Sequence, residues 1–486
     1  MKEKRIYPEE YKIRFEKLQK LKEMKIEPFA YRFDGKVDIK VIRDRESELL
    51  DKEVRTAGRL KFFRDFGKLI FAVIEDESDK LQIVLEKSSL NEKYQIFRKY
   101  IDPGDIIGVE GKLGKTQKGE LSIFVKDFIL LTKALLPLPE KFHGLQDKEL
   151  MYRKRYLHLI SDLNSREVFK LRTKIFDFIR NFLNKNKFIE VETPILQPIY
   201  GGATARPFKT YSNALDTELY LRISNELYLK RLIVGGFERV YEFSKDFRNE
   251  GIDKSHYPEF TLLEGYIAYW DYEILSLFIE ELLYSLVIEI KESSQIEYQG
   301  QKISFERPFK RINYIEYLKS KIGFNPLEAD VKKLQNVAKD LGIEENKYPK
   351  VLDKIFDYFS SKEFINPTFV FNYPKELSPL AKKKRDEDRL TERFELYIAG
   401  IEVVNAFSEL NDPIDQEERF LKQVELRELG DEEAHAFDED YIEALSYGMP
   451  PTAGFGIGMD RLCMILLDKP NIRDVILFPG LRPKKE

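Results

Sequence analysis

Residues 237–272 read FERVYEFSKDFRNEGIDKSHYPEFTLLEGYIAYWDY, and this stretch decides the fold. Two runs with alternating apolar residues flank a polar loop, which predicts a long antiparallel hairpin. One face of its second strand carries four side chains spaced two residues apart: Phe260, Leu262, Glu264 and Tyr266. A half-buried carboxylate needs a cationic partner. Glu264 therefore forms either a structural ion pair with Arg239 or Arg248, or part of a functional site.

A second stretch, residues 448–467, reads GMPPTAGFGIGMDRLCMILL. Gly454, Gly456 and Gly458 alternate, so one strand face lacks side chains and a flat or phosphate-bearing ligand can approach the backbone. Arg461 enters the following helix, where a permanent cation can meet a phosphate. Alternating glycines alone more often mark close packing than a nucleotide site. Their combination with the hairpin favours the nucleotide site.

Outward from these stretches, the pattern indicates an α+β domain with a mostly antiparallel sheet flanked by helices. Residues 188–196, FIEVETPIL, predict a strand ended by Pro194, and strands are expected to dominate residues 219–269. Helical spacing returns at residues 307–365, which we interpret as an insertion, and two strands are expected about a turn at Gly400. One helix face is predicted from Val168, Leu171, Ile175, Ile179 and Phe182.

The N-terminal third shows a different pattern. Residues 8–25 have the spacing of a basic amphipathic helix, and residues 54–131 contain five short β-like runs separated by turn signals. Five strands in such a span are typical of a small closed barrel of the OB type. The predicted organisation is a helical extension (1–53), an OB-fold barrel (54–134), a linker (135–150) and a catalytic domain (151–486).

The amino-acid composition argues against several classes of protein. Hydrophobic residues make up 43% of the 486, the net charge is −4, and no apolar run is long enough for a membrane span. No secretory signal is recognisable, so we expect a soluble cytoplasmic protein. One cysteine, Cys463, and four scattered histidines argue against a disulfide framework and a Cys/His zinc site: His143, His158, His256 and His435. Any metal is expected to have oxygen ligands.

At this point the chain resembles a known family. FRNEG followed by HYPEFTLLE resembles the second signature motif of class II aminoacyl-tRNA synthetases, GFGIGMDR resembles the third, and FIEVETP resembles the first, dimer-forming motif. Within that class, phrases along nearly the whole chain are similar to bacterial-type lysyl-tRNA synthetases: KFHGLQDKE, YRKRYLHLI, GGATARPF, ELYLKRLIVGGFERVYE, AFSELNDP, GMPPTAGFGIG and IRDVILFP. Aspartyl and asparaginyl enzymes are the nearest relatives to reject.

The resemblance implies an activity and its partners. The expected reaction is activation of L-lysine by ATP to lysyl-adenylate, followed by transfer of lysine to the 3′-terminal adenosine of tRNA(Lys), in a homodimer that uses Mg²⁺. Arg248 and Arg461 are the expected catalytic residues, because two arginines and Mg²⁺ stabilise the charge that develops on the phosphoryl oxygens. The residues expected at ATP are Arg248, Asn249, Glu250, His256, Phe260, Gly456, Gly458 and Arg461.

The other sites follow from the same resemblance. A buried ammonium needs carboxylates, and hard oxygen ligands suit Mg²⁺. The residues expected at lysine are Gly202, Glu226, Arg248, Glu264, Tyr266, Asn405, Phe407 and Glu409. The expected metal ligands are Glu395 and Glu402; without the resemblance each is an exposed glutamate on a strand. The residues expected at the anticodon are Arg64, Phe71, Gln82 and Glu120, with the N-terminal helix along the anticodon stem.

Several points stay open at this level. Without the resemblance, Phe71 is better interpreted as a core residue. Glu402 is out of phase with Asn405, so a bulge or a different face is required there. Gly265 and Val404 depart from the residues expected at their positions and put the tightness of the lysine pocket in doubt. Two rival functions are a paralogue that lysylates a protein, which lacks the barrel, and an inactive RNA-binding relative, which lacks the catalytic arginines.

Overall fold

The computed structural model describes residues 8–138, 147–345, 347–428 and 436–483. The chain forms two compact units, one up to Arg166 and one from Glu167 onward. Within the predicted linker, residues 139–146 lie outside the described residues, and helix α6 begins at Lys148. His143 and His435 also lie outside them. No helix in the described parts of the chain is long and apolar enough to cross a membrane.

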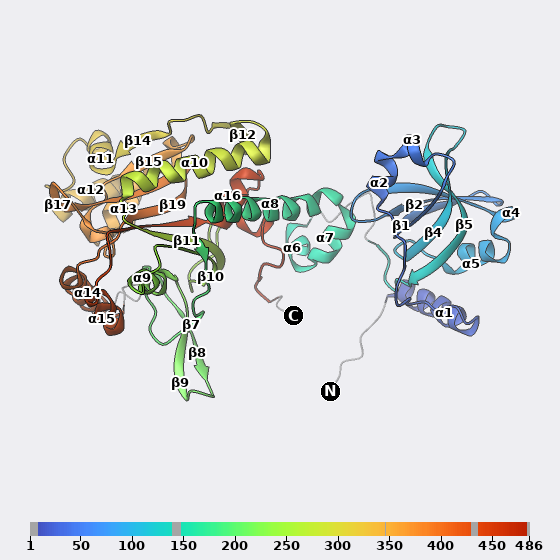
Figure 1. The fold of residues 1–486 in the computed structure, drawn as a ribbon, viewed down its shortest axis with the longest axis horizontal. Helices are drawn as coiled ribbons and strands as arrows, with labels where there is room; N and C mark the ends of the chain where they lie inside the picture. Colours follow the sequence, from blue (N-terminus) through green and yellow to red (C-terminus); the bar gives the residue numbers. More distant parts are fainter. Residues whose placement is uncertain (1–7, 139–146, 346, 429–435, 484–486) are drawn as a thin grey trace. The chain divides into compact units, whose positions relative to one another are not determined.

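The first unit contains the predicted five-stranded barrel, which is closed in the order β1-β2-β3-β5-β4 (Figure 1). Along β2, Ile70, Ala72 and Ile74 are buried in the barrel core, whereas the alternate residues Phe71 and Val73 are only half-buried. The strands are β1 Glu53–Asp65, β2 Leu69–Glu75, β3 Lys80–Glu86, β4 Ile106–Lys115 and β5 Leu121–Thr132. The helices are α1 Glu9–Glu23, α2 Ile39–Asp44, α3 Glu46–Leu49, α4 Lys87–Leu90, α5 Glu92–Tyr100, α6 Lys148–Arg153 and α7 Arg155–Ser161.

The second unit is built on an eight-stranded sheet in the order β14-β15-β18-β19-β20-β11-β10-β6. Only the β14–β15 and β6–β10 pairs are parallel, so the sheet is mostly antiparallel, as predicted. The predicted hairpin is β10 Arg239–Phe247 and β11 Glu259–Ala268. The glycine-rich strand is β20 Thr452–Gly458. The other strands of the sheet are β6 Ile189–Glu190, β14 Lys310–Asn313, β15 Thr368–Phe371, β18 Arg393–Ile398 and β19 Ile401–Ser408.

Helices cover both faces of this sheet. On one face α8, α10 and α16 pack against apolar strand residues and form the main core, and the expected α8 face with Ile175 and Ile179 is buried there. On the other face α9, α14 and α15 form a smaller core with Tyr266 and Phe407 (Figure 1). Their bounds are α8 Leu163–Lys185, α9 Glu226–Val234, α10 Tyr272–Lys291, α14 Pro413–Glu428, α15 Glu439–Ser446 and α16 Met459–Leu466.

The predicted insertion contains three helices that pack together on the edge of the sheet. They are α11 Tyr314–Ile322, α12 Val331–Asp340 and α13 Lys350–Glu363. Residues 310–313, which we expected to be part of the helical insertion, instead form β14 because they pair with β15. The remaining elements are β7 Leu196–Gln197, β8 Phe208–Ser212, β9 Thr217–Leu221, β12 Gln295–Tyr298, β13 Gln301–Ser304, η1 Lys375–Leu377, β16 Lys383–Lys384, β17 Glu387–Thr391 and η2 Ile472–Asp474.

Two further details of the secondary structure differ from the prediction. The strand expected at residues 188–196 is reduced to β6, since only Ile189 and Glu190 pair with β10 at the sheet edge. Strands β9, β10 and β11 dominate residues 219–269 as expected, but residues 226–234 form the helix α9, which was not predicted. Its buried residues Leu227, Lys230 and Ile233 recur every three positions, which is the spacing of one helix face.

Candidate functional site

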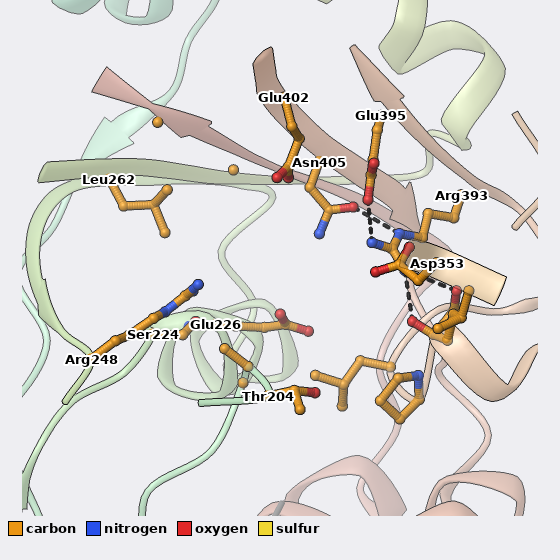
Figure 2. A pocket seen from close by; sticks show the side chains of 18 of the residues that line it. Thr204, Ser224, Glu226, Arg248, Leu262, Asp353, Arg393, Glu395, Glu402 and Asn405 are labelled. Atoms are coloured by element: carbon orange, nitrogen blue, oxygen red, sulfur yellow. Dashed lines mark hydrogen bonds and ion pairs between the residues drawn. The ribbon is translucent and has the colours of Figure 1, made fainter. Parts of the chain in front are cut away.

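A cavity of about 860 Å³ lies in the second unit and brings the predicted catalytic-domain residues together. Its walls come from β11, β18, β19 and β20, from the start of α9 and from α13 (Figure 2). Every residue expected at ATP, lysine or metal lines it except Asn249, whose backbone N–H donates to the carbonyl of Arg206 at 2.8 Å. The alternation of β11 explains the convergence, because Phe260, Leu262, Glu264 and Tyr266 all face this cavity.

Glu264 is buried at one end of the cavity and has neutral hydrogen-bond partners. Its carboxylate accepts from Ser224 Oγ at 2.9 Å and from the Tyr266 hydroxyl at 3.1 Å. Among the described residues it has no salt bridge, so the structural ion pair with Arg239 or Arg248 is not formed. Burial, reinforced by nearby negative charges, raises the pKa of Glu264 well above its ordinary value. A cationic ligand beside Glu264 would stabilise its charged form and lower this pKa.

The other buried carboxylates of the hairpin do have a cation. Arg222, which follows β9, donates to Glu242 Oε1 at 2.7 Å and forms an ion pair with Asp246 at 3.1 Å. Glu242 is the direct cross-strand partner of Glu264. Glu242 therefore has a cationic partner within the fold, whereas the hydrogen-bond partners of Glu264 are the neutral hydroxyls of Ser224 and Tyr266.

Two further carboxylates at this end meet an internal lysine. Lys230 of α9 is fully buried, and its Nζ lies 2.5 Å from Glu226 Oε1 and in contact with Glu409 Oε2. Burial opposes the ammonium, but the two carboxylates raise the pKa of Lys230 above its ordinary value. Burial raises the pKa of Glu409 well above its ordinary value, with Lys230 opposing the shift. The lysine-site prediction included both glutamates and missed this cation.

At the other end, the residues expected at ATP are more exposed and weakly held. The Arg248 guanidinium lies 5.1 Å from the centre of the Phe260 ring, and its Nε donates to the Ile223 carbonyl at 3.4 Å. Phe260 is half-buried and its ring borders the cavity. An arginine stacked on an aromatic ring, with a single long hydrogen bond, can turn toward an anion.

Arg461 of α16 contacts two other predicted residues. It donates to the Glu402 carboxylate at 3.1 Å and to the Glu402 carbonyl at 2.9 Å. Its Nη2 lies 2.9 Å from His256 Nε2, and His256 Nδ1 lies 2.8 Å from the Asp253 carboxylate. Gly458 precedes the helix, so the guanidinium reaches across a strand face without side chains. Arg461 lies in the helix that follows the glycine strand, as predicted, and its contact with a phosphate stays a prediction.

Glu395 and Glu402 both line the cavity but differ in burial. Glu395 is 6% exposed and accepts from the hydroxyls of Tyr373 and Tyr397 and from Arg393. Burial raises the pKa of Glu395 to about 7, with Arg393 opposing the shift and Glu402 adding to it. The side chain of Glu402 is 39% exposed. Both face the cavity rather than bulk solvent alone, so the interpretation as exposed strand glutamates is wrong for Glu395.

The bulge required near Glu402 is present. In the β18–β19 pair, Leu396 lies opposite Val404 but Tyr397 lies opposite Glu402, so Val403 is the extra residue. The turn that joins the strands uses positive φ at Ala399 and Gly400, 54° and 72°. In the described ranges, no group of three or more His, Cys, Asp or Glu side chains is arranged to hold a metal ion.

Gly265 and Val404, which put the tightness of the lysine pocket in doubt, do not line the cavity. A Cβ at Gly265 would overlap the ring of Phe455, which belongs to the main core on the far face of the sheet. Val404 is fully buried in the same core. Both departures therefore concern core packing, since the Val404 side chain and a Cβ added at Gly265 both meet the main core.

The structure adds site residues that the sequence reasoning missed. Arg393 lines the cavity and binds Asn405 Oδ1 at 2.9 Å and Glu395 Oε1 at 2.5 Å (Figure 2). Asp353 reaches the cavity from α13. Signals for two of them existed: Lys230 stands four residues after Glu226 on an apolar helix face, and Arg393 shares a strand face with Glu395.

On the barrel, three of the predicted anticodon residues lie on the neighbouring strands β1, β2 and β3, and Glu120 lies directly before β5. Arg64 is the cross-strand partner of Phe71, and Gln82 pairs with Val73, two residues along the same face. Gln82 also donates to Ser122 Oγ at 2.8 Å, whose hydroxyl donates to the Glu120 carbonyl at 3.1 Å. Phe71 is half-buried and lies outside the barrel core. The interpretation of Phe71 as a core residue is therefore wrong.

The N-terminal helix α1 is partly tied to the barrel. Arg14 is 9% exposed and donates to the Pro103 carbonyl at 2.9 Å, and Lys17 lies 2.5 Å from Asp102. Leu18 and Leu21 are buried as expected, whereas Phe15 remains 42% exposed. Four basic residues remain on the exposed side of the segment: Lys12, Lys20, Lys22 and Lys25.

Comparisons with known proteins match both units. Residues 147–482 match the family described as tRNA synthetases class II (D, K and N), and residues 54–131 match the OB-fold nucleic acid binding domain. Lysine–tRNA ligase of Syntrophomonas wolfei is 50% identical over 479 residues, 97% of each chain. The enzyme of Carboxydothermus hydrogenoformans is 50% identical over 97% of this chain and 98% of its own. That of Aquifex aeolicus is 52% identical over 90% of this chain and 74% of its own.

Proposed function

The chain belongs to the class II tRNA synthetases for aspartate, lysine and asparagine, and we propose that it activates L-lysine with ATP and charges tRNA(Lys). The products of the first step are lysyl-adenylate and pyrophosphate. The 3′-hydroxyl of the terminal adenosine of the tRNA then attacks the adenylate carbonyl, and AMP leaves. The charged and buried end of the cavity supports lysine among the three amino acids of the family.

The single observation that carries this choice is the set of carboxylates around Glu264. Glu264 is 5% exposed, lacks a cationic partner among the described residues, and shares the cavity end with Glu226 and Glu409. An ε-ammonium placed between Glu264, Tyr266 and Glu409 gains charge-assisted hydrogen bonds. An aspartate side chain would meet like charges there, and an asparagine amide would leave a buried carboxylate without its counter-ion.

For activation, the residues of the open end act as charge stabilisers. The lysine carboxylate attacks the α-phosphorus, so two anions must approach one another and no general base is needed. Arg248 leaves Ile223 and bridges the α-phosphate and the lysine carboxylate, while Phe260 stacks on adenine. Arg461 exchanges Glu402 and His256 for the γ-phosphate. Glu250, His256 and the bare strand at Gly456 and Gly458 complete the nucleotide pocket.

The donor set also fits Mg²⁺ held together with phosphate oxygens. Glu395 and Glu402 supply two oxygen donors, and Mg²⁺ in nucleotide sites is usually bound by one or two carboxylates plus phosphates. Mutual repulsion contributes to the raised pKa of Glu395, as expected where a dication is normally present. Bound there, Mg²⁺ would neutralise charge on the triphosphate.

For tRNA, the barrel supplies recognition from a unit other than the one that contains the cavity. Phe71 stacks on a base of the anticodon, Arg64, Gln82 and Glu120 contact base edges, and the exposed lysines of α1 contact stem phosphates. The four-part organisation at 1–53, 54–134, 135–150 and 151–486, a homodimer formed through the first motif, and a cytoplasmic location complete the proposal.

The experiment that tests the function is ATP–pyrophosphate exchange without tRNA, with Mg²⁺ and each of the standard amino acids in turn. Exchange with lysine alone is the expected result. Exchange with aspartate or asparagine would overturn the assignment of the carboxylate pocket. Aminoacylation of tRNA(Lys) in the same preparation tests the second step separately.

A further inference from the structure

The internal lysine of the cavity has a position that the reaction described above does not use. The Lys230 side chain is 0% exposed, its Nζ contacts Glu226 Oε1 and Glu409 Oε2, and it lies 5.4 Å from the centre of the Phe407 ring. Glu226, Glu409 and Phe407 all line the cavity. A buried ammonium is unfavourable unless nearby anions compensate it, so this arrangement requires a reason.

The two carboxylates reach Lys230 from different elements. Glu226 begins α9 and lies one helical turn before Lys230, which is the spacing at which side chains meet. Glu409 follows β19, where its backbone N–H donates to the Thr452 carbonyl at 2.8 Å. Lys230 therefore joins α9 to the strand that carries Asn405 and Phe407. In doing so it fixes the positions of both carboxylates.

In each carboxylate one oxygen forms the ion pair with Lys230 and the other does not. Glu409 Oε1 is buried and has no hydrogen-bond partner among the described residues. This oxygen lies directly beside Gly454, which lines the cavity. A Cβ at Gly454 would overlap both Glu409 Oε1 and the Tyr266 ring. An unpartnered buried oxygen beside a bare strand position is an acceptor for a ligand.

A count of charges defines the ligand. Glu226, Glu264 and Glu409 contribute three negative charges and Lys230 one positive charge, which leaves two negative charges at this end. An amino acid with an α-ammonium and a side-chain ammonium neutralises both. With Lys230 absent, three adjacent carboxylates would repel one another and take up protons, and the acceptors for the ligand would be lost.

We propose that Lys230 is a positioning residue that sets the charge selectivity of the amino-acid pocket, holding Glu226 and Glu409 so that their remaining oxygens select an amino acid with two ammonium groups. This role rests on the proposed lysine activation. Lys230 contacts the carboxylates rather than the substrate, so it acts through them.

The matched control is its neighbour on the same helix. Arg231 is likewise a cation between two carboxylates, Asp438 at 2.9 Å and Asp440 at 2.9 Å, but it is only partly buried and neither carboxylate lines the cavity. Lys230→Met and Arg231→Met therefore remove the same charge from adjacent positions. Only the first changes the amino-acid pocket.

The test is lysine-dependent ATP–pyrophosphate exchange, with thermal melting of each variant. Lys230→Met is expected to raise the KM for lysine about 100-fold and to leave the KM for ATP nearly unchanged. Arg231→Met is expected to lower the melting temperature and spare both constants. The double variant Lys230→Met with Glu226→Gln restores the net charge of this end. Its KM for lysine is expected to be about tenfold lower than that of Lys230→Met alone.

Three outcomes would overturn the role. The KM values for lysine and ATP could rise together, Lys230→Met could behave like Arg231→Met, or the charge-restored pair could show no recovery. If Lys230→Met does not fold, Lys230→Gln, which keeps an amide donor between the carboxylates, is measured against the same pair. Lack of exchange with lysine in the unmodified protein would instead refute the proposed function.

Discussion

The two ends of the catalytic cavity differ in how deeply their charged side chains are buried. At the amino-acid end, Glu226, Glu264 and Glu409 are 6%, 5% and 1% exposed. At the nucleotide end, the side chains of His256 and Glu402 are 53% and 39% exposed. Both ends carry charged side chains, but those of the first lie inside the protein and those of the second are in contact with water.

This difference determines what each end can discriminate. A buried carboxylate without a counter-ion carries a large desolvation cost, so the wrong side chain at Glu264 is strongly disfavoured. The arginines of the open end, Arg248 and Arg461, have partners that they can exchange for phosphate oxygens. We infer that the buried end provides selectivity and that the open end provides stabilisation of the transferring phosphoryl group.

The largest expected effect comes from the open end. Arg248→Ala should reduce lysine-dependent pyrophosphate exchange by about 1,000-fold, because it removes a cation that stabilises the transition-state charge. The loss should fall on kcat more than on the KM for lysine, since the ε-ammonium pocket is unchanged. Steady-state exchange kinetics measure both constants.

Arg239→Ala is the control for this variant. Arg239 begins β10, the strand that Arg248 follows, donates to the Asn186 carbonyl at 2.7 Å and does not line the cavity. It should retain exchange activity even if it lowers thermal stability. Activity of Arg248→Ala close to that of Arg239→Ala would contradict the assigned role of Arg248.

The buried end should show a smaller loss of activity together with a gain in stability. Glu264→Gln is expected to raise the KM for lysine about 100-fold, because the ε-ammonium loses a charged acceptor. Folding raises the pKa of Glu264, so its contribution to stability is present at low pH and is lost as the pH rises through the folded-state value. At neutral pH the amide should therefore melt at a higher temperature than the carboxylate.

Glu242→Gln sharpens the comparison. Glu242 is the cross-strand partner of Glu264, but it is paired with Arg222 and hydrogen-bonded to Asn225 at 2.8 Å. Removal of its charge should lower the melting temperature. If both variants shift the melting temperature in the same direction, the absence of a counter-ion at Glu264 has no energetic consequence and the inference from burial is wrong.

The charged residues of the cavity also show which features can be predicted from the sequence alone and which cannot. The hairpin, the glycine strand and the bulge near Glu402 follow from local periodicity, and they place Glu264 and Arg461 in one cavity. The helix α9 was missed because its apolar residues also fit a strand pattern, and with it the partnership of Lys230. Contacts between distant elements, such as that of Lys230 with Glu409, leave no periodic signal.

The departures at Gly265 and Val404 illustrate the same limit. From the sequence, a residue between Glu264 and Tyr266 is close to the pocket, yet a strand turns alternate side chains to opposite faces. What occupies the far face depends on Phe455, which comes from another strand. Only the three-dimensional packing shows that these substitutions concern the core.

A smaller effect is expected on the barrel, where the residues proposed to bind the anticodon are exposed or half-buried. Phe71→Ala should raise the KM for tRNA(Lys) about tenfold, because it removes one stacking contact. Exchange with lysine alone should be unaffected, since the cavity lies in the other unit. Tyr31→Ala, which removes a 98% exposed aromatic side chain, is the control. Equal loss of exchange and of aminoacylation would mean that Phe71 supports the fold instead.

The smallest effect is a release of protons when lysine binds. Burial raises the pKa of both Glu264 and Glu409 in the ligand-free protein, and an arriving ammonium favours their charged forms. Lysine binding should therefore release protons, and its affinity should rise with pH by at most about tenfold per unit for each proton released. Calorimetry in buffers of different ionisation enthalpy measures the release. It should shrink in Glu264→Gln. The absence of any proton release would show that the carboxylates are already charged before lysine binds and would contradict this prediction.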